Sequence, residues 1–151
     1  MPTEINIVLV RPIYPRNIGM CARAIANMGA SKLILIAPQC ELSEEAHQGA
    51  ACAQSILAMT KIYSSLENFY AHEGEGLRIA FSTRKSKIRQ SENWQIQLQK
   101  LKIEFSEQVL PSNIYLFFGS EDDGLTAEEI KLAFKQFVNL DKQLLVTVGQ
   151  P

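Results

Sequence analysis

The chain of 151 residues has the length of one domain with a sizeable core, and its 46% hydrophobic and 21% charged residues are typical of a soluble globular protein. Its apolar runs are too short to cross a bilayer, and its three cysteines show neither a Cys-x-x-Cys spacing nor paired histidines, which argues against a disulfide framework and a zinc site. A net charge of −1 and a pI of about 6.1 exclude a uniformly basic nucleic-acid-binding protein. We therefore expect one cytoplasmic domain, residues 1–151, without a metal ion.

Five apolar runs rich in β-branched and aromatic residues predict strands. Most of them are continuous rather than alternating, which is typical of parallel strands that are covered on both faces. The five runs are residues 5–10, 32–37, 79–83, 114–118 and 144–148.

Helical patterns lie between these runs. In the first, apolar residues repeat at helical spacing from Ile18 to Met28, and we expect Asn17 as its N-cap and Gly29 as its stop. In the last, Thr126 and Glu129 form a capping box. Further helices are expected over residues 43–59, 65–71 and 94–105. Alternating strands and helices predict an α/β fold with an open, mostly parallel sheet and helices on both faces.

The start of the first helix carries unusual charges. In "YPRNIGMCARAIANMG", Arg16 and Arg23 flank a helix N-terminus, where the helix dipole favours negative charge. Cations there do not stabilise the helix, so this pattern favours a negatively charged group bound nearby; by itself, each arginine is also consistent with an ordinary solvated surface residue. Ligands of open α/β sheets bind beyond the carboxyl ends of the strands, which is where this loop begins.

The loop "GSEDDGLT" after the fourth run is a second candidate. Gly119 and Gly124 predict tight turns on either side of Glu121. By itself this loop is equally an ordinary strand-to-helix connection with acidic residues in the first helical turn. It is neither a phosphate-binding loop nor a calcium-binding EF-hand.

Together the two loops resemble a known family. "RPIYPRNIGMCARAIANMG" resembles the first motif of the SpoU/TrmH class of SPOUT methyltransferases, which has the spacing Pro-x-Asn-x-Gly-x-x-x-Arg. "LFFGSEDDGLTAEEI" resembles the second motif, Gly-x-Glu-x-x-Gly-Leu-Thr-x-Glu-Glu. "INIVLV" and "IAFSTRKSKIR" are similar to the TrmJ branch of this class. The resemblance extends over residues 5–139.

The resemblance implies an S-adenosyl-L-methionine-dependent 2′-O-methyltransferase that acts on the ribose of tRNA or rRNA. It also implies a SPOUT-type α/β knot and a homodimer, in which Arg23 of one subunit lies near the cofactor of the other. The matching positions imply catalytic or orienting roles for Asn17, Arg23 and Glu121. Cofactor contacts are implied for Ser82, Thr83, Gly119, Asn139 and Leu140. Because the basic residues of the two loops at the same edge favour phosphate, we expect RNA contacts from Arg11, Arg16, Arg84, Lys85, Lys87 and Arg89.

The C-terminal sequence departs from the family. The third motif, with a Ser-Leu-Asn sequence, is expected after Phe137, but the chain reads "FVNLDKQLLVTVGQP". The knot is therefore expected to be incomplete at the C-terminus. A second hypothesis is an RNA-binding remnant of this fold that lacks the cofactor loop. A third is an unrelated doubly wound nucleotide-binding or regulatory domain.

Overall fold

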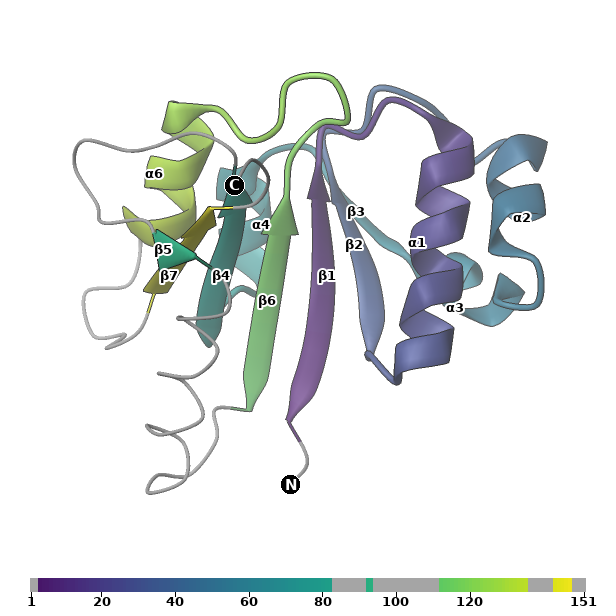
Figure 1. The fold of residues 1–151 in the computed structure, drawn as a ribbon, viewed down its shortest axis with the longest axis horizontal. Coiled ribbons are helices and arrows are strands. Elements are labelled where there is room, and N and C mark those ends of the chain that lie inside the picture. The colour runs from purple at the N-terminus through teal and green to yellow at the C-terminus, as the bar shows by residue number, and fades with distance from the viewer. Residues whose placement is uncertain (1–2, 83–91, 94–111, 136–142, 148–151) are drawn as a thin grey trace.

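A computed structural model describes residues 3–82, 92–93, 112–135 and 143–147. Its centre is a seven-stranded sheet in the order β3-β2-β1-β6-β4-β7-β5, and all strands pair in parallel (Figure 1). The strands are β1 Glu4–Val10, β2 Lys32–Ile36, β3 Lys61–Tyr63, β4 Leu77–Ser82, β5 Glu92–Asn93, β6 Asn113–Phe118 and β7 Gln143–Thr147. The prediction of an open, parallel α/β sheet is confirmed.

Helices cover both faces of the sheet, as predicted. One face carries α1 Pro15–Met28, α2 Glu44–Ala50 and α3 Gln54–Ala58, and the other carries α4 Leu66–His72 and α6 Ala127–Lys135 (Figure 1). In the described part of the chain, no helix has the length and apolar composition needed to cross a membrane.

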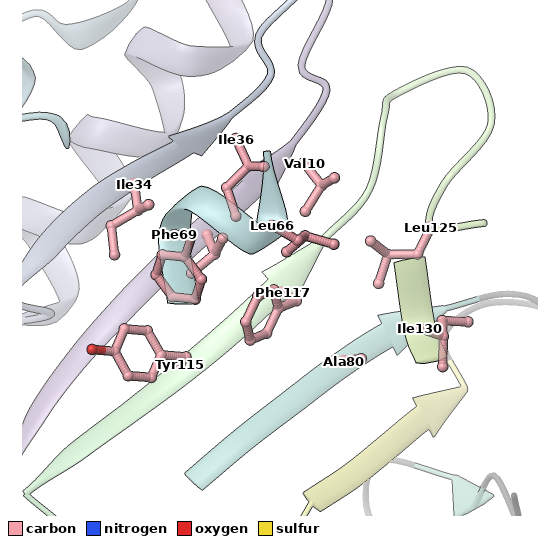
Figure 2. Packing of buried hydrophobic residues seen from close by; sticks show 11 residues of the cluster. Val10, Ile34, Ile36, Leu66, Phe69, Ala80, Tyr115, Phe117, Leu125 and Ile130 are labelled. Atoms are coloured by element: carbon pink, nitrogen blue, oxygen red, sulfur yellow. The ribbon is translucent and has the colours of Figure 1, made fainter. Parts of the chain in front are cut away.

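The α4 and α6 face holds an aromatic core. Phe69 is fully buried, and its ring makes edge-to-face contacts with Tyr115 at 5.5 Å and with Phe117 at 6.0 Å between ring centres (Figure 2). Arg78 of β4 is also fully buried, and its guanidinium lies 5.0 Å from the centre of the Tyr70 ring. Burial of Phe69 alone contributes roughly 2–3 kcal/mol to folding.

On the opposite face, α1 and α2 approach each other through two glycines. A Cβ atom on Gly19 would lie 2.0 Å from the carbonyl oxygen of Ala46, and one on Gly49 would lie 2.5 Å from that of Arg16. Real Cβ atoms do not come this close, so the helix pair depends on both glycines. This contact fixes the first turn of α1, which belongs to the first motif.

A polar cluster ties strands together at the amino edge of the sheet. The Glu73 carboxylate accepts hydrogen bonds from the hydroxyls of Tyr63 at 2.5 Å and Tyr115 at 3.1 Å. It also forms ion pairs with Lys32 at 2.9 Å and Lys61 at 3.6 Å, the first residues of β2 and β3. Burial raises the pKa of Glu73, but Tyr63, Lys32 and Tyr115 outweigh it and hold the pKa below its ordinary value.

Three details differ from the sequence predictions. Asn17 is not the N-cap of α1, because Pro15, whose ring fixes a helical φ, starts the helix and leaves Tyr14 as its extended cap. The helix expected over residues 43–59 is broken after Ala50, where Ala51 has a φ of 50°, and becomes α2 and α3. The short strands β3 and β5 were not predicted. The helix expected over residues 94–105 lies outside the described residues.

Gly29 ends α1 as predicted, with a φ of 75° and its N–H bonded to the carbonyl of Ile25. The capping box at α6 is also confirmed. The N–H of Thr126 donates to Glu129 at 2.8 Å, and the N–H of Glu129 donates to the Thr126 hydroxyl at 3.0 Å.

Candidate active site at the carboxyl edge of the sheet

The two predicted motif loops are neighbours in space. β1 pairs with β6 and β6 pairs with β4, all in parallel, so the carboxyl ends of these strands meet at one edge (Figure 1). The loop after β1 leads into α1, and the loop after β6 leads into α6. Residues about 100 positions apart in the sequence therefore lie together at the edge where such sheets bind ligands.

Glu121 joins the two loops. Its carboxylate accepts hydrogen bonds from the backbone N–H groups of Ile13 at 3.1 Å and Tyr14 at 2.8 Å, and from the side-chain amide of Asn17 at 3.5 Å. All three donors belong to one short segment, residues 13–17, at the start of the first motif. Glu121 thus fixes the shape of the first-motif loop and the position of Asn17.

The hydrogen bonds keep Glu121 ionised. Partial burial raises the pKa of its carboxyl, but the N–H groups of Tyr14 and Ile13 and the amide of Asn17 outweigh burial and lower the pKa. The charged form is therefore the one that holds the loop.

Glu129, eight residues after Glu121, makes a second connection between the two motif loops. The guanidinium of Arg11 forms a two-point ion pair with Glu129, with Nε–Oε2 at 2.6 Å and Nη2–Oε1 at 2.9 Å. Nη2 also donates to the carbonyl of Gly124 at 3.3 Å. Burial raises the pKa of Glu129, but the hydrogen bonds from Arg11 and Thr126 outweigh it and lower the pKa.

The two glycines of the second motif shape its turn, as predicted. Gly124 has a φ of 70°, which favours glycine, and its N–H donates to the carbonyl of Ser120 at 2.7 Å. A Cβ atom on Gly119 would lie 2.0 Å from the carbonyl carbon of Gly124. Gly119 is therefore required for close backbone approach within the turn.

The structure brings together some of the predicted site residues. Asn17 and Glu121 are in contact, and Gly119 lies at the base of the same loop. Arg16 and Arg23 are exposed on α1. Arg23 follows Asn17 by six residues, about 9 Å along the helix axis. In the part of the chain that the structure describes, no contact joins its guanidinium to Glu121.

Ser82 is the last residue of β4. Phe81, the residue before it, pairs in the parallel register with Phe118, the residue before Gly119. The other predicted residues lie outside the described residues; they are Thr83, Arg84, Lys85, Lys87, Arg89, Asn139 and Leu140. Residues 136–142, where the knot is expected, also lie outside them.

Sequence reasoning missed the role of three groups at this edge. The N–H groups of Ile13 and Tyr14 were not recognised as donors, because backbone groups leave no signal in the side-chain pattern. Glu129 was recognised only as part of a capping box, although it is also the partner of Arg11. Among the described residues, no group of three or more His, Cys, Asp or Glu side chains could hold a metal ion.

Comparisons with known proteins agree with this geometry. Residues 4–143 match the model of the SpoU rRNA Methylase family. The tRNA (cytidine-2′-O-)-methyltransferase TrmJ of Methanocaldococcus jannaschii is 32% identical over 126 residues, which are 83% of this chain and 53% of that protein. The chain thus spans about half the length of this curated relative.

Two solved structures share the fold. TrmJ from Z. mobilis ZM4 superposes with a TM-score of 0.67 at 24% identity and covers 100% of this chain and 60% of its own. The AdoMet-bound rRNA methyltransferase from Sinorhizobium meliloti superposes with a TM-score of 0.67 at 16% identity, and the match covers 100% of this chain and 49% of that chain. The two motifs meet at one edge of a sheet with this fold, and the family model matches nearly the whole chain. The chain therefore belongs to the SpoU rRNA Methylase family.

Proposed function

We propose that the chain is the methyl-transferring domain of an S-adenosyl-L-methionine-dependent RNA 2′-O-methyltransferase, with tRNA as its preferred substrate and rRNA as the alternative. The observation that carries this proposal is the contact of Glu121 with Asn17 and the N–H groups before it, which joins the two family motifs. The tRNA preference rests on the similarity to the TrmJ protein of Methanocaldococcus jannaschii.

The cofactor would lie where β4 and β6 end. Ser82 ends β4 and Gly119 directly follows β6, so both bring backbone groups to this edge. Asn139 and Leu140 would complete the pocket, as the resemblance implies. When bound, S-adenosylmethionine supplies an electrophilic methyl group on a sulfonium. The rRNA methyltransferase from Sinorhizobium meliloti, which has a similar fold, is AdoMet-bound, and this supports the choice of cofactor.

The residues of the chain would mainly hold the RNA in position. A guanidinium group has no acceptor atom and is not deprotonated in proteins, so Arg23 is not assigned as the base. We assign it to the phosphate next to the reacting ribose, where it orients the 2′-hydroxyl, while a phosphate oxygen or water accepts the proton. Glu121 is ionised and already bound to three donors, so its role is to hold Asn17 and the loop. Correct placement of the hydroxyl can supply much of the rate enhancement.

We propose that the active form is a homodimer. Between α1 and the adjoining face of β1 and β6, the described residues form an apolar groove of about 330 Å³, lined by Ile5, Cys21, Ala24, Met28, Leu116 and Phe118. Met28, one of the lining residues, is 85% exposed, and an exposed apolar side chain that continues an apolar groove is typical of an interaction surface. Arg23 is next to Ala24, which lines this groove, and the resemblance implies that Arg23 of one protomer lies near the cofactor of the other. Sedimentation velocity at the concentrations of the enzyme assay tests for the homodimer. A monomer that is active at these concentrations would contradict the proposal.

The free thiols of Cys21, Cys40 and Cys52 support action in the cytoplasm, where thiols stay reduced. Localisation by fractionation of cells checks this part of the proposal.

Titration of the protein with S-adenosylmethionine by calorimetry separates the proposed enzyme from a non-catalytic RNA-binding remnant. Saturable binding at one site per chain supports the enzyme. An absence of binding, together with salt-dependent binding of tRNA, supports the remnant.

A further inference from the structure

We propose that Arg11 is a positioning residue that holds the two motif loops together, and that it does not contact RNA. The inference rests on the proposed function, because it assigns a role at the same site. It replaces the phosphate-binding role that the basic sequence "RPIYPR" suggests.

The guanidinium is already engaged by its own chain. Two of its nitrogens bind both carboxylate oxygens of Glu129, at 2.6 and 2.9 Å, and one of them also donates to the carbonyl of Gly124. The two side chains are only 28% and 13% exposed. A fork-to-fork pair of this kind combines charge with fixed geometry, so Arg11 is oriented as well as neutralised.

The backbone of Arg11 is fixed as well. Its φ of 54° lies in the left-handed region that non-glycine residues seldom adopt. Its N–H donates to the carbonyl of Ile36 at 2.7 Å, and the carbonyl of Pro12 accepts the N–H of Gln39 at 2.8 Å. The turn after β1 is therefore held by the loop after β2. An unusual conformation that its surroundings enforce is often found at functional sites.

The partner of Arg11 is itself a capping residue. Glu129 accepts the N–H of Thr126 and so fixes the start of α6, while Arg11 also binds the Gly124 turn before that helix. Two residues after Arg11, the N–H of Ile13 donates to Glu121. The pairs Arg11–Glu129 and Tyr14–Glu121 therefore join the same two loops at two points. Loss of the first pair is expected to loosen the second.

A phosphate that binds the Nε and Nη2 fork of Arg11 would have to displace Glu129. This exchange would leave the cap carboxylate, which is 13% exposed, without its cation. Partly buried charges that lose their partner are costly, so the internal pair is favoured. Arg16 and Arg23 are exposed and have no such partner among the described residues, which leaves them as the better phosphate contacts.

The test compares Arg11→Asn, Arg11→Lys, Glu129→Gln and the double variant Arg11→Asn/Glu129→Gln. Asparagine tolerates the left-handed backbone, lysine keeps the charge but loses the fork, and glutamine keeps an acceptor for the cap. Asp123→Asn, which removes an exposed carboxylate near Arg11, is the matched control. Hydrogen exchange of the Ile13 and Tyr14 amides is measured in each full-length protein.

We expect these two amides to exchange about tenfold faster in Arg11→Asn and in Glu129→Gln, with amides of the central strands unchanged. In the double variant these amides should exchange no faster than in the single variants, because each single substitution already removes the same ion pair. In Arg11→Lys the exchange rate of these amides should lie between those of the two single variants and that of the wild type. Asp123→Asn should exchange like the wild type. Unchanged exchange at Ile13 and Tyr14 in Arg11→Asn would overturn the proposal.

Two further measurements separate positioning from RNA contact. In the methyl-transfer assay, kcat should fall about tenfold in Arg11→Asn and in Glu129→Gln, with KM for tRNA nearly unchanged. The slope of log affinity for tRNA against log salt should stay at its wild-type value in Arg11→Asn; a slope reduced by about one would show a phosphate contact and overturn the proposal. If the wild type transfers no methyl group, the proposed function fails, whereas amide exchange still decides the role of Arg11.

Discussion

The carboxylate of Glu121 accepts a hydrogen bond from the backbone N–H of Tyr14 at 2.8 Å, across 107 positions of sequence. Tyr14 is the cap of α1, whose first turn contains no acidic residue of its own. A negative charge from the second motif therefore lies just ahead of the helix that carries Arg16 and Arg23. The anion that the helix start was expected to attract is in part supplied by the chain itself.

Substitution of Glu121 should affect activity more than stability. Glu121→Gln keeps one acceptor oxygen but loses the charge that binds Ile13, Tyr14 and Asn17. We expect methyl transfer to fall by about tenfold or more, with a loss of roughly 1 kcal/mol in unfolding free energy. Steady-state kinetics and urea unfolding measure the two effects. Asp122→Asn, at the neighbouring exposed carboxylate, is the control, because asparagine keeps the Oδ1 that accepts the Tyr14 hydroxyl at 3.5 Å. Equal losses in both variants would contradict a specific role for Glu121.

Arg23 is assigned to the RNA and not to the cofactor. Arg23→Ala should lower turnover by about a hundredfold or more and leave the affinity for S-adenosylmethionine nearly unchanged. Arg23→Lys keeps the charge but loses the two-point geometry, so it should recover only part of the activity. Kinetics on tRNA and calorimetry with the cofactor provide both values. A matching loss of cofactor affinity would show that the assignment is wrong.

The close contact between α1 and α2 predicts a large steric effect at one glycine. Gly19→Ala would place a Cβ atom 2.0 Å from the carbonyl oxygen of Ala46, so the two helices must move apart. We expect a loss of about 3 kcal/mol in unfolding free energy. Gly29→Ala, at a φ of 75° with no atom within 4 Å, should lose only about 1 kcal/mol because it costs backbone strain alone. Denaturant unfolding of both variants checks the order, and a Gly29→Ala loss as large as that of Gly19→Ala would contradict it.

The Glu73 cluster predicts a pH-dependent contribution to stability. Because the folded-state pKa of Glu73 is lowered, its contribution is complete above the ordinary pKa and is lost as the pH falls through the folded-state pKa. Glu73→Gln should cost roughly 1–3 kcal/mol at pH 7, where two tyrosine hydroxyls and Lys32 lose their charged partner. The difference from the wild type should shrink below about pH 4. Thermal unfolding of both proteins at about every pH unit between roughly pH 3 and 7 tests this trend. A difference in stability that stays constant over this range would refute it.

The main elements of the fold could be predicted because their signals are local. The strand runs are continuous and apolar, Gly29 ends α1, and Thr126 with Glu129 caps α6 within four residues. The sequence also predicts that Gly119 and Gly124 shape a tight turn. Each of these depends on residues that are close in the chain, so single-sequence patterns contain enough information.

The missed features depend on distant partners or weak patterns. β3 has three residues at the sheet edge, and Lys61 and Ile62 are exposed, so it lacks a buried apolar run. The Arg11–Glu129 pair spans 118 positions, and nothing in the basic sequence around Arg11 indicates a carboxylate there. The resemblance implies roles for Asn17 and Glu121, but only the structure shows that Glu121 is bound to the loop that carries Asn17.

Transfer of a labelled methyl group from S-adenosylmethionine to tRNA, followed by mass spectrometry of the released nucleosides, tests the central claim most directly. We expect label on the ribose 2′-oxygen of a nucleoside in tRNA, and its loss in Arg23→Ala. Label on a base, or no label in tRNA and rRNA although the protein is folded and dimeric, would contradict the assignment of this sheet edge to ribose methylation.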